Sequence, residues 1–184
     1  MHGGAAMASK ANRTGRGDGW RIARWTIPAL LLTIPLIAKA PWTLSDFLVM
    51  GVLLFGSVGI YELAARASGS LTYRAGIGVA VATSFLLIWI NLAVGIIGSE
   101  DNPLNLLYAG VLGVALLGSV VTRFGPGGMA RAFAVTAVAQ ALVGAVAVMS
   151  GANEPPGALG LAILNGGFVA LWLAAAALFR RTAR

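Results

Sequence analysis

The chain has 184 residues, of which 58% are hydrophobic and 10% are charged, and its mean hydropathy is +0.85. An average soluble domain carries about 25% charged residues, so this composition excludes an ordinary soluble domain and indicates a chain embedded in lipid. A net charge of +7 would suggest a nucleic-acid partner for a soluble protein, but the basic residues here follow a membrane pattern and we expect no nucleic acid. The absence of cysteine excludes disulfides and thiol chemistry.

Residues 1–20 are rich in glycine, alanine and serine, which predicts a disordered cytoplasmic tail before a membrane domain at 21–184. Six apolar stretches in that domain each have about the length of a helical membrane crossing. They cover about 22–40, 46–65, 75–97, 104–122, 130–149 and 158–179. Backbone amides in lipid need internal partners, and the stretches lack the alternation of barrel strands. The sequence therefore predicts an all-α integral membrane protein, a six-helix transmembrane bundle with short loops.

The charged residues predict the orientation of these crossings, because cytoplasmic loops carry the excess of lysine and arginine. Twelve of the thirteen basic residues lie in the N-terminal tail, the second loop, the fourth loop and the C-terminus, and only Lys39 does not. The opposite side holds four acids, namely Asp46, Glu100, Asp101 and Glu154. We therefore predict a multipass membrane protein with both termini in the cytoplasm. Five crossings would separate the basic termini and are rejected.

Glu62 is the only carboxylate inside a predicted span and away from its first residue, which makes it a candidate proton carrier or transport residue. Arg66 follows four residues later, in the favourable order for a helical ion pair, and this pairing is the preferred interpretation. Aromatic side chains near the span ends are typical of the belt at headgroup level. Those assigned to the belt are Trp25, Trp42, Tyr73 and Tyr108.

The segment from Trp42 to Phe47 has the pattern of a helix start. Thr43 and Asp46 are spaced as a capping box, and Trp42 and Phe47 as its hydrophobic staple. We expect a structural role and no catalytic one.

The second outer loop concentrates oxygen ligands at Glu100 and Asp101, beside Asn102 and Asn105. Such a set is suited to a hard cation such as calcium, although the spacing of a calcium loop is missing. The preferred alternative is that Asp101 or Asn102 caps the fourth helix, with Pro103 in its first turn.

Gln140, Asn91 and Asn165 are polar residues deep in predicted spans. If they converge, they would line a neutral cavity for a small solute, but such residues more often join helices to one another. Ala137 and Ala141 belong to a small-residue face, completed by Ala145, that favours close helix contact. The only histidine is His2, so no histidine-based metal or catalytic site is expected in the membrane domain.

Two pairs of arginines suggest tandem helical hairpins. Arg66 and Arg74 are eight residues apart across the second loop, as Arg123 and Arg131 are across the fourth. Parallel repeats of this kind occur in some transporters. Alternating topology alone also puts arginine into alternate loops, so both explanations stay open.

The stretch from Trp89 to Pro103, with its NLAVGIIGSEDNP core, resembles a family of small multipass bacterial inner-membrane proteins. The WTxxDF motif at Trp42 to Phe47 and the residues from Gly128 to Ala132 resemble it too. The likeness covers roughly residues 21–180. Its members have no assigned activity, so the resemblance implies a multipass inner-membrane protein and assigns no functional residue.

The leading functional prediction is a non-enzymatic structural or accessory membrane subunit without a metal or cofactor. Its expected partners are the lipid bilayer and either a second copy or another membrane protein. The alternative is a small-solute or ion transporter or channel, with a polar site around Gln140, Asn91 and Asn165.

Overall fold

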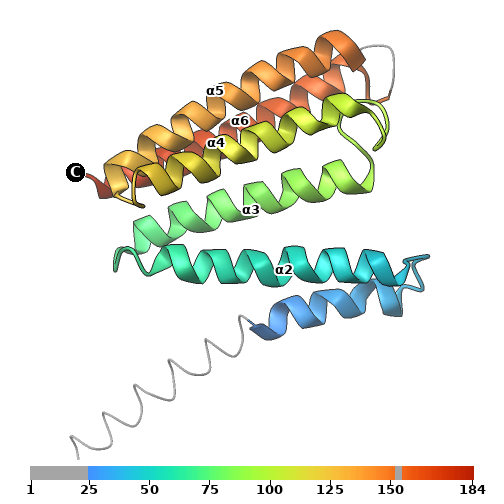
Figure 1. Ribbon diagram of the computed structural model, residues 1–184, viewed down its shortest axis with the longest axis horizontal. Coiled ribbons are helices and arrows are strands. Elements are labelled where there is room, and N and C mark those ends of the chain that lie inside the picture. The colour runs from blue at the N-terminus through green and yellow to red at the C-terminus, as the bar shows by residue number, and fades with distance from the viewer. Residues whose placement is uncertain (1–24, 152–154) are drawn as a thin grey trace, which may run out of the picture. The chain divides into compact units, whose positions relative to one another are not determined.

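The computed structural model describes residues 25–151 and 155–184, and every regular element in these two ranges is helical (Figure 1). The chain divides into two compact units, one ending at Val58 and the other running from Gly59 to Arg184. The predicted tail at 1–20 and Glu154 lie outside the described residues.

In the first unit, the helix Trp25–Ile37 forms a hairpin with the part of α2 (Leu44–Ala65) that ends at Val58. The rings of Trp25 and Phe55 stack with their centroids 6.2 Å apart. Within the described residues, the first helix is shorter than the roughly 20 residues that a perpendicular crossing takes. The sixth crossing therefore stays a prediction.

The predicted capping box at the start of α2 is confirmed. The Thr43 amide donates to Asp46 Oδ2 at 2.7 Å, and the Asp46 amide donates to Thr43 Oγ1 at 3.3 Å. The hydrophobic staple is confirmed as well, because the rings of Trp42 and Phe47 meet edge to face at 5.3 Å. Both contacts fix the direction in which the chain enters the helix.

The second unit continues with helices that confirm the predicted all-α membrane fold. Five helical segments of the described chain are long and apolar enough to cross a membrane. In chain order they are α2, α3, η1 together with α4, α5 and α6. The bounds in this unit are α3 Leu71–Ala93, η1 Pro103–Leu106, α4 Leu107–Val121, α5 Pro126–Gly151 and α6 Gly157–Thr182.

Two of these helices begin about one turn earlier than hydropathy suggests. The α3 helix starts at Leu71 and not near residue 75, because the Ser70 hydroxyl accepts a hydrogen bond from the Tyr73 amide and caps it. The α5 helix starts at Pro126 and not near residue 130, since proline has no amide hydrogen to leave unpaired in a first turn.

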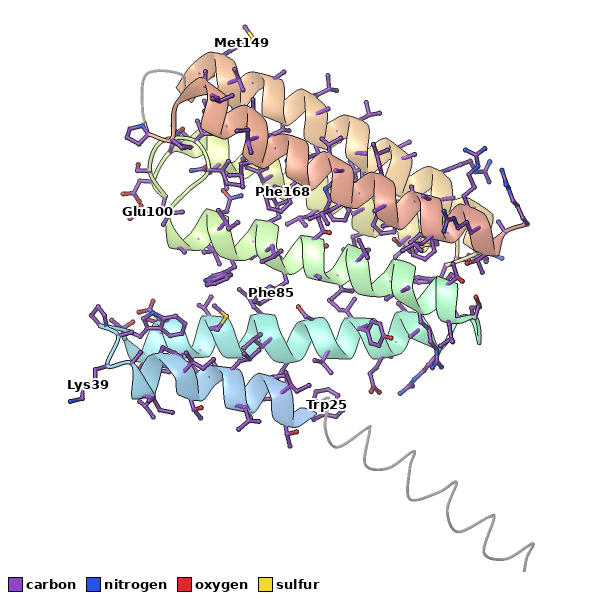
Figure 2. All side chains as sticks on the ribbon, turned by 180° about the vertical axis from the view of Figure 1, so that it is seen from behind. Trp25, Lys39, Phe85, Glu100, Met149 and Phe168 are labelled. Atoms are coloured by element: carbon purple, nitrogen blue, oxygen red, sulfur yellow. The ribbon has the colours of Figure 1, made fainter. Side chains whose placement is uncertain are left out.

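Within the second unit, α6 packs against both α5 and α3, and α5 also packs against α4 (Figure 1). A row of aromatic rings joins α3, α5 and α6: Phe179 lies 5.1 Å from Tyr73 and 5.4 Å from Phe133, which stacks on Trp172 at 5.7 Å. A Cβ added at Gly76 would lie 3.0 Å from the Phe179 ring, so this glycine lets the ring reach the α3 backbone. Figure 2 shows Phe168 pointing into the same interior.

Candidate functional site

The main polar feature of the second unit is a buried hydrogen-bond network that joins α4, α5 and α6. Gln140 Nε2 on α5 donates to Asn165 Oδ1 on α6 at 2.9 Å. The same oxygen accepts from the Tyr108 hydroxyl on α4 at 3.0 Å. Trp172 Nε1 donates to Gln140 Oε1 at 3.4 Å, and Asn165 Nδ2 donates to the Leu161 carbonyl at 2.9 Å. The network brings together two of the three predicted polar residues, Gln140 and Asn165.

Close helix packing encloses this network. Gln140 is 0% exposed and Asn165 is 4% exposed. A Cβ added at Gly144 would lie 2.8 Å from Asn165 Cβ, so glycine is the residue that lets α5 and α6 approach here. The amide groups thus contact protein on all sides, and their hydrogen bonds hold the three helices in one register.

Asn91 does not take part in this network. Its Nδ2 donates to the Leu87 carbonyl one turn earlier on α3, at 3.3 Å. Among the described residues, its Oδ1 is the one buried side-chain nitrogen or oxygen atom without a hydrogen-bond partner. The three residues suggested as one polar lining therefore lie in two separate environments.

Other buried hydroxyl groups are satisfied by their own helices. Thr83, Ser119 and Thr136 donate to the carbonyls four residues before them, at 2.7, 2.7 and 2.9 Å. A hydroxyl bonded in this way does not need water or a solute as its partner.

Tyr73 and Tyr108 differ from the lipid-facing belt residues that the sequence suggests. They are 0% and 1% exposed, and each hydroxyl bonds inside the unit. Tyr73 donates to the Phe124 carbonyl at 2.6 Å, in the turn between α4 and α5. Arg123 and Phe124 both have positive φ in that turn, and the Tyr73 hydrogen bond helps to hold this conformation.

The loop between α3 and α4 is organised by Asn105, a role that the sequence does not indicate. Its Oδ1 accepts from the amides of Ile96 and Ile97 at 3.1 and 2.9 Å, and its Nδ2 donates to the Ser99 carbonyl at 2.7 Å. Gly95 has a φ of +71°, and a Cβ there would lie 2.4 Å from the Ser99 carbonyl carbon. Asn105 and Gly95 together thus determine the path of the loop between α3 and η1.

Of the two predicted caps, Asn102 is the one found: its Oδ1 accepts from the Leu104 amide at 3.0 Å and caps η1, the short helix that leads into α4, with Pro103 in its first turn. The first residues of α4 itself have no side-chain cap. Glu100 and Asp101 are exposed, and Figure 2 shows Glu100 on the outside of the loop. Across the part of the chain that the structure describes, no three acidic or histidine side chains gather as metal ligands would.

Glu62 lies half-buried in the last turn of α2, and Arg66 follows in the turn beyond the helix. The predicted ion pair between them stays a prediction. Glu62 does not belong to the Gln140 network, whose members carry amide, phenol and indole groups.

Comparison with known protein families, curated proteins and solved structures finds no match. The resemblance around Trp89 to Pro103 therefore stays a prediction. The length and apolar character of the helices are those of a multipass membrane protein.

Proposed function

We propose that this chain is a non-enzymatic structural or accessory subunit of a bacterial inner membrane, with six crossings and both termini in the cytoplasm. The observation that carries the proposal is the enclosed network of Gln140, Asn165, Tyr108 and Trp172. A transport path needs polar groups that a solute can reach, whereas here they bond to one another between packed helices. Polar residues used in this way stabilise a helix assembly.

An open glycine face on α4 supports contact with another helix. A Cβ added at Gly110 or Gly113 would have no atom within 4 Å. Glycines on an exposed helix face let a second backbone approach closely, which is the usual basis of helix association in lipid. We propose that a second copy or another membrane protein packs on this face.

The test is the mass of the particle extracted in mild detergent. We expect the wild-type chain to migrate as an assembly and Gly113→Ile to migrate as the single chain. Gly167→Ile is the matched control, because an added Cβ there also has no atom within 4 Å but lies on α6, outside the α4 face. A wild-type particle that contains one chain and no partner would contradict the proposal.

The proposed orientation has its own test. Reporter fusions after Asp101 and after Arg184 should report opposite sides of the membrane, with Arg184 in the cytoplasm. The same side for both fusions would contradict the orientation.

A further inference from the structure

A groove of about 490 Å³ lies between α5 and α6, at the end where α5 begins and α6 ends. Its α5 wall includes Ala130 and Ala134, and its α6 wall includes Ala177. Two arginines, Arg131 and Arg180, line it as well. The volume is within the range of small-molecule sites in proteins, which is about 300–1,000 Å³.

The groove exists because small side chains face outward along this part of both helices. Phe133 and Phe179 point the other way, into the aromatic row of the interior, and are nearly fully buried. Where both helices carry alanine along the same side, the short side chains leave space between the helices. In a bilayer an apolar space open to the lipid is filled by a hydrocarbon chain, because water would find few hydrogen-bond partners in it.

The two arginines add a specific polar requirement to this apolar groove. Arg131 lies five residues after Pro126, or about 7.5 Å along the helix, and Arg180 lies in the last turn of α6. Both are exposed near the helix ends, where the proposed crossings would reach the lipid headgroups. Of the described residues that line the groove, none is a carboxylate, so the wall itself offers these cations no counter-charge.

A guanidinium group presents paired N–H donors that match phosphate oxygens. Basic pockets between transmembrane helices accordingly favour anionic lipid headgroups. An apolar groove that ends at two arginines fits a molecule with a phosphate at one end and a hydrocarbon chain at the other.

We propose that this groove is a binding site for one anionic phospholipid. The phosphate binds between Arg131 and Arg180, and an acyl chain lies along Ala130, Ala134 and Ala177. The site is independent of the partner contact proposed for α4, because it lies on the α5–α6 pair.

The experiment uses the full chain in phosphatidylcholine nanodiscs with increasing phosphatidylglycerol. Bound lipid is counted by native mass spectrometry, and the unfolding midpoint is measured in parallel. We expect the wild type to retain phosphatidylglycerol and to unfold at a higher temperature with it. In Arg131→Gln/Arg180→Gln the apparent affinity should fall by about 30-fold.

The matched control is Arg74→Gln/Arg184→Gln, which removes the same charge from residues outside the groove. Its affinity should stay within about 3-fold of the wild type, since charges that only attract the bulk surface contribute little to one bound lipid. Equal losses in both double variants, or no preference for phosphatidylglycerol, would overturn the proposal.

A third variant, Ala177→Phe, fills the groove and keeps both arginines. It should lose the bound phospholipid while its unfolding midpoint in pure phosphatidylcholine stays near that of the wild type, which shows that it folds. Inorganic phosphate serves as the soluble competitor. The proposal is wrong if phosphate displaces the lipid completely and Ala177→Phe still binds phosphate. The site would then take a free anion.

Discussion

The α5–α6 pair is packed in two different ways along its length. Near Gly144 the helices are so close that an added Cβ would lie 2.8 Å from Asn165 Cβ, and the polar network sits beside this contact. Towards Arg131 and Arg180 the same helices leave a groove of about 490 Å³. Both regions use small residues, so small size alone does not determine how closely two helices pack.

What differs is the residue that faces the small one. At Gly144 the opposite helix presents the Asn165 side chain, which fills the space that glycine leaves. In the groove, alanines line the walls on both helices, and the large rings of Phe133 and Phe179 face the interior. On this helix pair, close packing occurs where a small residue faces a larger side chain of complementary shape.

The largest effect is expected from Trp172→Ala, because Trp172 belongs to both the network and the aromatic row. It is 0% exposed, stacks on Phe133 at 5.7 Å and donates to Gln140 at 3.4 Å. We expect a loss of about 3–5 kcal/mol in the free energy of unfolding, measured by denaturing-detergent titration.

Leu173→Ala is the control for this change. Leu173 is the next residue on α6, is 49% exposed and lines the groove. Its truncation should cost less than about 1 kcal/mol, because few buried contacts are lost. Similar losses for Trp172→Ala and Leu173→Ala would mean that the closely packed interior does not dominate the stability of this pair.

Gly144→Ala and Gly166→Ala compare the same substitution in a closed and an open position. The added methyl at Gly144 pushes against the Asn165 side chain, and we expect a loss of about 1–3 kcal/mol. At Gly166 nothing lies within 4 Å of an added Cβ, so the helix propensity of alanine should raise stability by up to about 1 kcal/mol. Unfolding midpoints that move in the same direction would contradict the packing difference.

Hydropathy and loop chemistry were enough to predict the helices and two of their caps, since both depend on residues close in sequence. Thr43 and Asp46 form the expected box, and Asn102 the expected cap. The network was predicted in part: Gln140 and Asn165 were identified because a polar group in lipid needs a partner.

Their partners could not be named from the sequence. Which groups meet Asn165 depends on how α4, α5 and α6 are rotated, and this rotation is set by contacts such as Gly144 against Asn165. The sequence therefore assigns Tyr108 to the belt, whereas its hydroxyl bonds inward to Asn165. The sequence likewise presents Asn105 as one oxygen ligand among several, because its contacts with Ile96 and Ile97 depend on the folded path of the loop.

The smallest effects are expected within the network itself, where single changes leave one donor in place. Gln140→Leu removes one donor to Asn165 Oδ1, and Tyr108→Phe removes the other. Each should lower the free energy of unfolding by about 0.6 kcal/mol, the average for hydrogen bonds between membrane helices, and by no more than about 1.7 kcal/mol. The double variant leaves that buried oxygen without a donor from either helix, so its loss should exceed the sum of the single losses by at least about 0.5 kcal/mol. A strictly additive cycle would mean that the two bonds act independently, and that the network does not hold α4, α5 and α6 as one unit.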